Sequence, residues 1–439
     1  MGGQQDARTR IEAEFPAMSE EWKPLLQGDL AARALAAVHD IAAALESQEE
    51  SEGSRYASLA GGLSGQALFY TYLALQSGDD APAERAAQLV EQAVDVLAVT
   101  PLPANLYTGF AGVAWTMEHL RGRLFAEDGD EDEDPVQEID EALLAPLQRS
   151  PWTGDYDLIT GLVGLGVYAL ERLPRPTAKT LLGSVVARLA ETADVGEEGA
   201  AWFTRPEDLP EWQREFHSQG NYNLGVAHGL PAVVAVLAGA AAAGIEGARP
   251  LLDDSVRFLL ARRQDPSVGS CFSTVYAPWE PPTSSRLAWC YGDPGVAAAL
   301  LTAGHTVGET AWEREALDVA LAAIARPESN SGIRDAGLCH GAAGLAHLFN
   351  RMYHTTGEER LAEAARFWFQ RTLELRQPGE GVGGFRSWGT IGEGIDNLGW
   401  RDEPGFLEGA AGVGLALLGA ISDVEPAWDR VLAVSVHTV

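Results

Sequence analysis

One short glycine signature occurs seven times in this chain, and it constrains the fold more than any other feature. A glycine, two further residues and, in six of the seven copies, a second glycine precede a stretch rich in alanine and leucine. The first glycines stand at positions 62, 109, 161, 229, 292, 341 and 409, so successive copies lie 47 to 68 residues apart. Each interval can hold two helices and their connections, which predicts a repeat architecture.

Two kinds of helix alternate along the repeats. The stretch Pro82 to Val99 begins with proline, which is favoured in a first helical turn, and carries polar residues at helical spacing. Such patterns indicate outer helices, whereas the stretches after the glycines are apolar nearly all round, as buried inner helices are. We therefore expect an all-α, double-layered (α/α) toroid of about seven inner and seven outer helices. It would form one domain over residues 1–439, with the repeats at about 30–422, and its glycines would let converging inner helices approach each other.

Three segments interrupt the repeat pattern, and a fourth, Asp265 to Ser285, resembles two of them. The strongly acidic stretch at about 126–138 is predicted to be a solvated loop, with attraction of a cationic partner as the alternative. The segments Val195 to Gly220, Asp265 to Ser285 and Pro378 to Pro404 carry isolated aromatic residues and are candidates for lids over an opening. A small inserted β element in one of them is left open.

Charge and cysteine content exclude several classes of protein. With 63 acidic against 31 basic side chains and a net charge of −32, the chain is unsuited to nucleic acid or anionic membrane, and a neutral or cationic partner is favoured. Three cysteines cannot build a disulfide framework, and the N-terminus lacks the apolar core of a secretory signal. The longest uncharged apolar run, from Ala232 to Ile245, is shorter than the roughly 20 residues that span a bilayer. These features predict a cytoplasmic protein that does not cross a membrane.

Reactive side chains stand directly before the repeat glycines. Cys290 lies two residues before Gly292, and Cys339 and His340 lie two and one before Gly341. If the repeats are equivalent, these side chains meet at one mouth of the toroid. Two cysteines and a histidine suit Zn²⁺, and three protein ligands leave a fourth position open, as in catalytic zinc sites. Cys271 matches no repeat position and is expected to be structural.

Four further residues are candidates for catalysis beside this metal site. His228 directly precedes Gly229, and a histidine can exchange a proton near neutral pH, although a lone histidine at a helix start is often structural. Asp157 either orients His228 or caps a helix. Arg286, four residues before Cys290, offers N–H donors to an oxyanion, and Tyr291 follows Cys290 directly. His217 is a second-rank candidate.

The sequence resembles the lanthionine synthetase C-like (LanC) family, the cyclases of lanthipeptide and lantibiotic biosynthesis. The resemblance rests on the strings NLGVAHG, RLAWCYGDPG, GLCHGAAGLAHLF and GFLEGAAGVGLALL, and the repeat covers about Gly61 to Ala420. It implies a stand-alone cyclase with an α/α toroid, one zinc ion held by Cys290, Cys339 and His340, and acid–base work by His228 with Asp157, Arg286 and Tyr291 nearby. One departure from the family pattern is Pro231, where the family often has a smaller residue followed by a second glycine; here alanine stands at that glycine's position.

The chemistry that the resemblance implies fits these side chains. A zinc-activated cysteine thiolate of a dehydrated precursor peptide would add to a dehydroalanine or dehydrobutyrine of the same peptide, closing a thioether ring. His228 would protonate the enolate, and Arg286 would stabilise it. The implied partners are the precursor, with leader and core, together with a lanthipeptide dehydratase and a transporter. Through a complex with these proteins the enzyme would associate peripherally with a membrane.

Two other interpretations compete with the cyclase. A helical-toroid glycosidase would use two carboxylates, for which Asp157 and Glu408 are available, but it leaves Cys290, Cys339 and His340 unexplained. A LanC-like zinc protein that binds a peptide, or adds glutathione or another thiol without forming a ring, keeps the metal site. The sequence alone does not separate this second interpretation from the cyclase.

Overall fold

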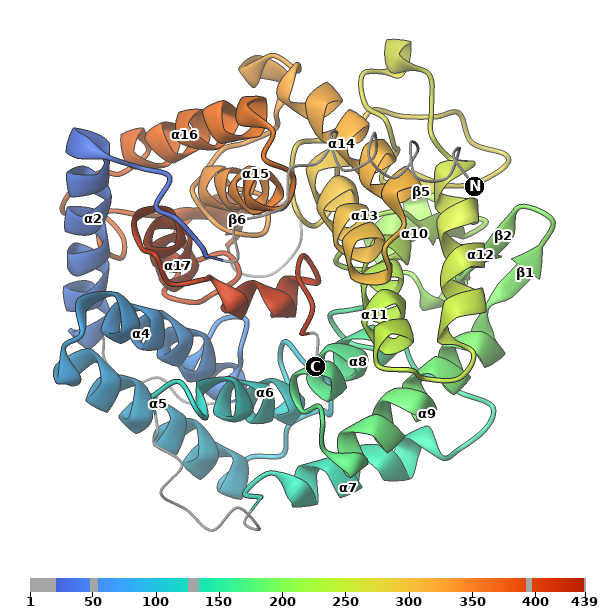
Figure 1. Ribbon diagram of the computed structural model, residues 1–439, viewed down its shortest axis with the longest axis horizontal. Coiled ribbons are helices and arrows are strands. Elements are labelled where there is room, and N and C mark those ends of the chain that lie inside the picture. Colours follow the sequence, from blue (N-terminus) through green and yellow to red (C-terminus); the bar gives the residue numbers. More distant parts are fainter. Residues whose placement is uncertain (1–20, 48–53, 125–133, 392–396, 438–439) are drawn as a thin grey trace, which may run out of the picture.

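The helices form a ring of two layers. A computed structural model describes residues 21–47, 54–124, 134–391 and 397–437, and Figure 1 looks down its shortest axis. Within this described part the inner layer consists of α4 (Leu63–Ser77), α6 (Phe110–Leu120), α8 (Leu162–Glu171), α11 (Leu230–Ala242), α13 (Asp293–Val307), α15 (Ala342–Thr356) and α17 (Ala410–Ile421). The outer layer consists of α2 (Gly28–Glu46), α5 (Asp80–Val99), α7 (Gln137–Leu147), α9 (Pro176–Thr192), α12 (Ala248–Leu260), α14 (Thr310–Ile324) and α16 (Glu359–Glu374). The predicted toroid of seven inner and seven outer helices is confirmed.

The two ends of the chain close the ring. Helix α2 packs against α17, which brings the first outer helix beside the last inner helix (Figure 1). The backbone N–H groups of Leu25 and Leu26 both donate to the carbonyl oxygen of Ala420, at 2.9 Å. The inner helices are buried over nearly their whole length, whereas α5 buries only Ala86, Leu89 and Ala93. This difference is the one that the apolar and amphipathic patterns predict.

The repeat glycines leave room for the loop before their own helix, and not for a neighbouring inner helix as we expected. A β-carbon on Gly292 would lie 2.0 Å from the carbonyl oxygen of Arg286, and one on Gly344 would lie 1.9 Å from that of Leu338. In both cases the approaching backbone is the loop just before the same helix, and not a neighbouring inner helix. The expectation of helix–helix crowding was therefore wrong at these positions. The unusual φ that we also expected occurs at Gly292, at +148°.

The C-terminal segment lies in the centre of the ring. Figure 1 shows it between the inner helices, and its 3₁₀ helix η4 (Ala427–Leu432) is almost entirely buried. The inner layer holds this segment by its backbone, since the side chains of Tyr107, Trp289 and Thr302 donate to the carbonyl oxygens of Val431, Leu432 and Val434 at 2.7 to 2.8 Å. The buried carboxylate of Asp429 also accepts from Arg351 at 2.8 Å. The hole of the toroid is thus filled by protein.

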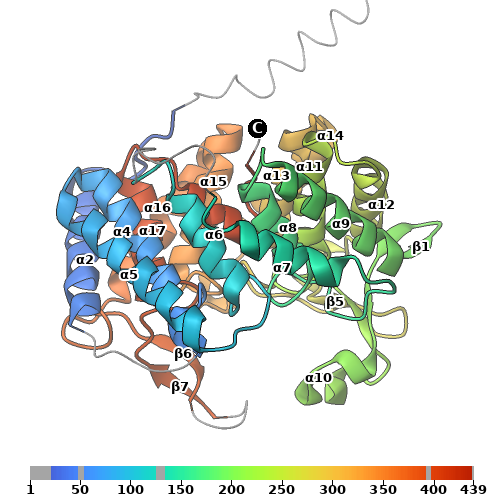
Figure 2. The ribbon, with the colours of Figure 1, turned by 90° about the horizontal axis from the view of Figure 1, so that it is seen from below.

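All three candidate lid segments contain short strands. The first contains β1 (Asp194–Gly196), which begins one residue before it, β2 (Gly199–Ala201), β3 (Phe203–Thr204) and the short helix α10 (Glu211–Phe216). Strand β3 pairs with β4 (Asn221–Asn223), which pairs in turn with β5 (Val275–Tyr276) from the second segment. The third segment forms a hairpin of β6 (Ser387–Thr390) and β7 (Leu398–Arg401). Figure 2 shows that α10 and this hairpin project from the same side of the ring, away from the C-terminus.

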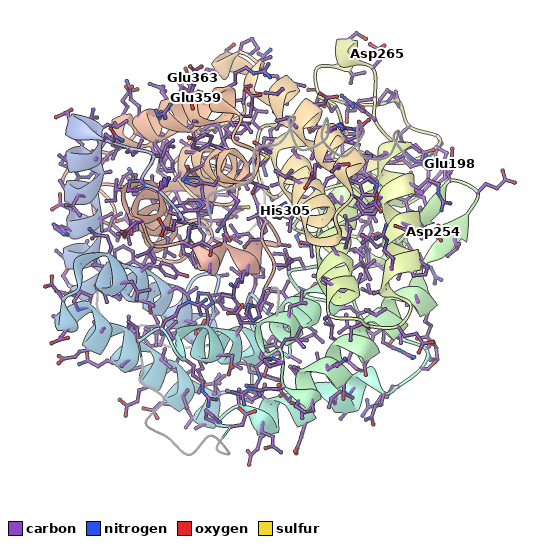
Figure 3. All side chains as sticks on the ribbon, in the orientation of Figure 1. Glu198, Asp254, Asp265, His305, Glu359 and Glu363 are labelled. Carbon is purple, nitrogen blue, oxygen red and sulfur yellow. The ribbon has the colours of Figure 1, made fainter. Side chains whose placement is uncertain are left out.

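Exposed acidic side chains lie at the periphery of the ring. The acidic segment at 126–138 lies mostly outside the described residues, but Asp134, at its described end, forms an ion pair of 2.5 Å with Arg172. Glu198, Asp265, Glu359 and Glu363 are exposed and lie at the periphery in Figure 3. Over the described ranges, no helix is both long enough and apolar enough to span a bilayer.

Candidate metal and acid–base site

A chain of backbone hydrogen bonds links the loops that precede the inner helices. It joins the residues that stand two positions before successive repeat glycines. The N–H of Ala227 donates to Cys290 at 3.4 Å, that of Cys290 to Cys339 at 3.2 Å, and that of Cys339 to Leu407 at 2.9 Å. Leu407 continues to Ala60 and Ala60 to Tyr107, both at 2.9 Å. Cys290 and Cys339 are therefore direct neighbours because they occupy the same position in adjacent repeats.

The next residue of each loop faces the mouth of the ring. The seven residues that directly precede the first repeat glycines are all exposed or half-buried, although both the glycines after them and the inner helices are buried. In chain order these residues are Gly61, Thr108, Thr160, His228, Tyr291, His340 and Glu408. One half of the mouth thus carries small residues and hydroxyls, and the other half carries the side chains suited to catalysis.

Cys290, Cys339 and His340 form the cluster that the sequence predicts. One ligand atom from each lies within 4.8 Å of the other two, and both cysteines are free and buried. A tetrahedral ion with Zn–S bonds of about 2.3 Å keeps its ligand atoms roughly 3.8 Å apart, so the observed grouping suits such an ion. The Nδ1 atom of His340 is buried and has no hydrogen-bond partner in the described structure. A buried nitrogen left in this way is what a metal ligand requires, and the residues present fit zinc.

The two thiols differ in their affinity for a proton. A hydrogen bond from the Cys339 thiol, together with His340 and Arg286, outweighs burial and holds the pKa of Cys290 well below its ordinary value. The same bond and burial raise the pKa of Cys339 well above its ordinary value. The Nη2 of Arg286 donates to the Sγ of Cys290 at 3.1 Å. The cluster therefore already stabilises one thiolate, the form in which cysteine binds metal.

His228 and Asp157 form a second polar pair at the mouth. The Nδ1 of His228 is hydrogen-bonded to the Oδ2 of Asp157, while the Oδ1 of Asp157 accepts from the N–H of Thr160 at 2.8 Å. Burial disfavours the charged ring, but the hydrogen bond and charge of Asp157 outweigh it, so the pKa of His228 lies above its ordinary value. The His228 side chain remains 44% exposed, and its other ring nitrogen has no hydrogen-bond partner among the described residues. The pair has the geometry of an oriented acid–base histidine.

Tyr291 lies beside this pair and depends on a residue that we did not predict. The rings of Tyr291 and His228 are stacked, with 6.4 Å between their centroids. Burial raises the pKa of Tyr291 to about 12. The Nδ2 of Asn223 donates to the Tyr291 hydroxyl oxygen at 3.2 Å. Asn223 precedes Gly229 by six residues, as Arg286 precedes Gly292. That shared offset was a signal in the sequence that would have found Asn223.

Proline in the fourth repeat leaves its loop intact. Pro231, the departure from the family pattern, lies in the first turn of α11, where the missing N–H removes no helical hydrogen bond. The helix begins after Gly229 with an extended backbone, as five of the other six inner helices begin after theirs. His228 therefore keeps the position that its repeat predicts.

Three other residues considered in the sequence have partners outside the cluster. His217 pairs with Glu280 at 2.8 Å on the projecting segment. Cys271 is buried and its N–H donates to Asp293 at 2.8 Å, consistent with a structural role. Glu408 lies at the mouth, where its carboxylate is hydrogen-bonded to Arg401 of the hairpin.

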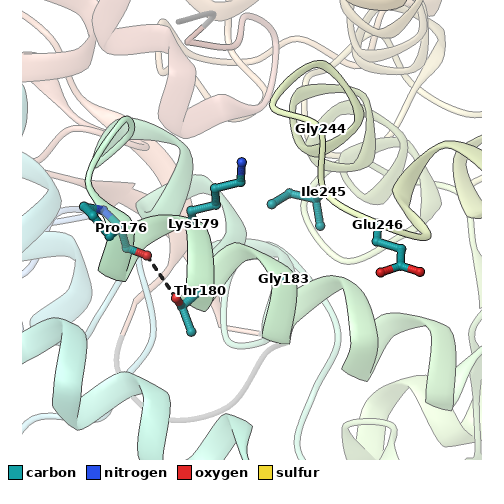
Figure 4. A pocket seen from close by; sticks show the side chains of 7 residues that line it. All are labelled: Pro176, Lys179, Thr180, Gly183, Gly244, Ile245 and Glu246. Carbon is teal, nitrogen blue, oxygen red and sulfur yellow. Dashed lines mark hydrogen bonds between the residues drawn. The ribbon is translucent and has the colours of Figure 1, made fainter.

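A separate groove on the outside of the ring contains none of these residues. It has a volume of about 530 Å³ and lies between α9 and the turn after α11, with Lys179, Ile245 and Glu246 among its lining residues (Figure 4). Its wide opening and the scarcity of converging polar groups give no chemistry to assign to it.

Comparison with known proteins identifies relatives of this chain. The family model described as lanthionine synthetase C-like protein matches residues 54–433. Nisin biosynthesis protein NisC of Lactococcus lactis subsp. lactis is 25% identical over 282 residues, which are 58% of this chain and 64% of that protein. The solved structure of a nisin cyclase matches 90% of this chain and 96% of its own, with 20% identity and a TM-score of 0.71. A sugar epimerase from a ruminal bacterium, with 11% identity and a TM-score of 0.49, is too distant to bear on function.

Proposed function

The chain belongs to the lanthionine synthetase C-like family, and from this premise we propose that it is a zinc-dependent lanthipeptide cyclase. One observation carries the proposal: Cys290, Cys339 and His340 group their ligand atoms within 4.8 Å at the mouth that also holds the His228–Asp157 pair. A metal site with an oriented histidine beside it suits activation of a thiol followed by transfer of a proton.

In this proposal Cys290, Cys339 and His340 hold one Zn²⁺ ion. When bound, zinc would supply the Lewis acidity that lowers the pKa of a substrate cysteine thiol from about 8.5. Arg286 stabilises the negative charge of Cys290 through its 3.1 Å contact, and thereby keeps this ligand deprotonated. The backbone hydrogen bond from Cys290 to Cys339 holds the two cysteine ligands side by side.

The bond-forming step adds the substrate thiolate to the β-carbon of a dehydroalanine or dehydrobutyrine in the same peptide. A carbon–sulfur bond forms, the electron pair of the double bond moves toward the neighbouring carbonyl, and an enolate results. His228 delivers a proton to the α-carbon from the ring nitrogen that does not contact Asp157. The thiol has lost one proton and the α-carbon has gained one, so a (methyl)lanthionine ring closes with no change in mass.

The remaining donors at the mouth stabilise the enolate. Arg286 uses one N–H group on Cys290 and has others to offer, and the Tyr291 hydroxyl lies beside the His228 ring. Preorganised donors that meet a developing oxyanion are a large source of rate enhancement. We assign Arg286 and Tyr291 to this role, with Asp157 orienting His228.

Two alternatives make different use of the same residues. A LanC-like zinc protein that binds a peptide, or adds glutathione or another thiol without closing a ring, would use the cluster alone and would not need His228. The glycosidase interpretation needs two available carboxylates, but Asp157 is paired with His228 and Glu408 with Arg401. The cyclase accounts for more of the observed contacts than either alternative.

The proposal extends to partners and setting. The substrate is a dehydrated precursor peptide with leader and core, supplied by a lanthipeptide dehydratase and passed to a transporter, and a complex of these proteins would bring the enzyme to a membrane surface. The free thiols of Cys290 and Cys339 suit a reducing compartment such as the cytoplasm. We also propose that residues 1–439 form a single domain.

Counting free thiols tests the function. The purified zinc-loaded protein is incubated with a dehydrated lanthipeptide precursor. The peptide is then alkylated and its mass is measured by mass spectrometry, because cyclisation alone leaves the mass unchanged. We expect each ring to remove one alkylation site. His228→Ala should keep its zinc but form rings slowly. Unchanged thiol counts with the wild-type protein would refute the cyclase, and a peptide mass increased by an added thiol would favour the second alternative.

A further inference from the structure

The inserted sheet of β3, β4 and β5 ends at the mouth of the ring. Strand β4 carries Asn223, whose backbone pairs with Val275 of β5. The side chain of Asn223 is buried, with 8% of the residue exposed, and reaches the hydroxyl of Tyr291. An element outside the toroid repeat therefore supports a residue of the candidate site.

The hydrogen bonds of Asn223 determine the orientation of its amide. The N–H of Gly225 donates to the Oδ1 of Asn223 at 2.9 Å. A backbone N–H can only donate, so the amide atom that it meets must be oxygen. The other amide atom, Nδ2, is then the donor at 3.2 Å to the Tyr291 oxygen. Tyr291 accepts this bond, and its own O–H proton must point elsewhere.

The position of the Tyr291 ring is also restricted. A β-carbon on Gly225 would lie 2.4 Å from Cδ1 and 2.7 Å from Cε1 of Tyr291, so the ring packs directly on the glycine backbone. On another side the ring stacks with His228 at 6.4 Å. With the ring fixed and the amide donor on one side of the oxygen, the hydroxyl proton is left for a group in the mouth.

We propose that Asn223 is a positioning residue, which directs the Tyr291 hydroxyl as a hydrogen-bond donor toward the substrate carbonyl oxygen that becomes the enolate oxygen. The inserted sheet holds Asn223 in place for this purpose. This inference rests on the proposed cyclase function and adds a residue that acts through Tyr291.

Asn223→Asp tests the role with little change in shape. A carboxylate still accepts from the Gly225 N–H but cannot donate to Tyr291, so the tyrosine would turn its proton toward residue 223. We expect kcat for thiol loss to fall about tenfold, with KM within twofold of wild type and one zinc ion per chain. Tyr291→Phe should cause a similar fall, and the double variant should be no slower than Tyr291→Phe alone.

Asn221 of the same strand offers the matched control. It is buried, and its side-chain nitrogen and oxygen have no hydrogen-bond partner among the described residues. Asn221→Ala should keep wild-type kcat. A loss equal to that of Asn223→Asp, wild-type kcat in Asn223→Asp, or additive losses in the double variant would each overturn the positioning role.

A second readout separates this inference from the proposed function. In protein labelled with 3-fluorotyrosine, the ¹⁹F signal assigned by its absence in Tyr291→Phe should shift in Asn223→Asp and not in Asn221→Ala. An unshifted signal would disprove the contact whatever the activity. A shifted signal together with a wild-type protein that consumes no thiols would refute the cyclase, and the positioning role with it, while the contact stands.

Discussion

Replacing Asp157 by asparagine tests the acid–base pair most sharply. In the wild-type site the Oδ1 of Asp157 accepts from the Thr160 N–H at 2.8 Å, and its Oδ2 contacts the Nδ1 of His228. In Asp157→Asn the backbone N–H of Thr160 still requires an oxygen, so the new NH₂ group must face His228. The histidine is then forced to accept at Nδ1, and it loses the negative charge that raises its pKa.

The expected loss is large because the protonated ring, which delivers the proton, is destabilised while the shape is kept: its Nδ1–H would face the new NH₂ group. The same carboxylate-to-amide change beside an acid–base histidine lowers kcat by about 10⁴-fold, and we expect a fall of about 10³- to 10⁴-fold here. That factor corresponds to about 4 to 5.5 kcal/mol of activation free energy. Zinc content should stay at one ion per chain, since Asp157 is not part of the Cys290, Cys339 and His340 cluster.

The assay is the rate at which alkylatable thiols disappear from the dehydrated precursor. Asp155→Asn is the matched control, because its carboxylate lies on the same loop and accepts from the Thr160 hydroxyl at 2.8 Å. We expect this control to stay within about tenfold of wild type, since the asparagine oxygen can still accept from that hydroxyl and exchanging the charged acceptor for a neutral one costs about 1 kcal/mol. A rate for Asp157→Asn equal to that of Asp155→Asn would refute the assigned role of the His228–Asp157 pair.

Two further predictions concern the metal and the centre of the ring. Cys290→Ala should lose its zinc, measured by elemental analysis after dialysis, because only one sulfur and one nitrogen ligand remain; full zinc content would show that the ligand assignment is wrong. His119 is fully buried between Tyr72 and Glu171, and burial lowers its pKa to about 4. Below pH 6.5 the unfolded histidine therefore binds a proton that the folded one does not bind until about pH 4. The free energy of unfolding therefore falls as the pH is lowered from 6.5 towards 4. Through His119 alone, the wild type should be about 2 kcal/mol less stable at pH 5 than at pH 7. His119→Gln, which can also donate to Glu171 and accept from Tyr72, should lose about 2 kcal/mol less than wild type in urea unfolding between these pH values, whereas the exposed-site control His305→Gln should behave as wild type. Equal losses in wild type and His119→Gln would contradict the buried neutral histidine.

Much of the fold could be predicted because each repeat predicts one inner and one outer helix. The spacing of the glycines and the contrast between apolar and amphipathic stretches are local signals, and they gave the two layers and the number of helices. The physical reason for the glycines could not be obtained in this way. The carbonyl of Arg286 that excludes a side chain at Gly292 belongs to a loop whose path is set by tertiary packing.

The site was predictable to the extent that it follows the repeat register. Cys290 and Cys339 meet because they hold equivalent positions, which a sequence shows as a fixed offset from a glycine. Asn223 shares with Arg286 an offset of six residues from a repeat glycine, but its contact with Tyr291 depends on the inserted sheet, whose strands of two and three residues are too short for a periodic signal. The filling of the ring by η4 was missed for a similar reason, since its contacts with Tyr107 and Trp289 join residues 324 and 143 positions apart.

X-ray absorption at the zinc edge tests the central claim most directly. The zinc-loaded protein alone should show two sulfur ligands, from Cys290 and Cys339, with the remaining ligands light atoms. Adding a cysteine-containing precursor peptide should raise the sulfur count from two to three, because the substrate thiol takes the open position; the same peptide with serine in place of cysteine should leave it at two. A sulfur count that stays at two with the cysteine peptide would contradict a zinc site that activates the substrate thiol.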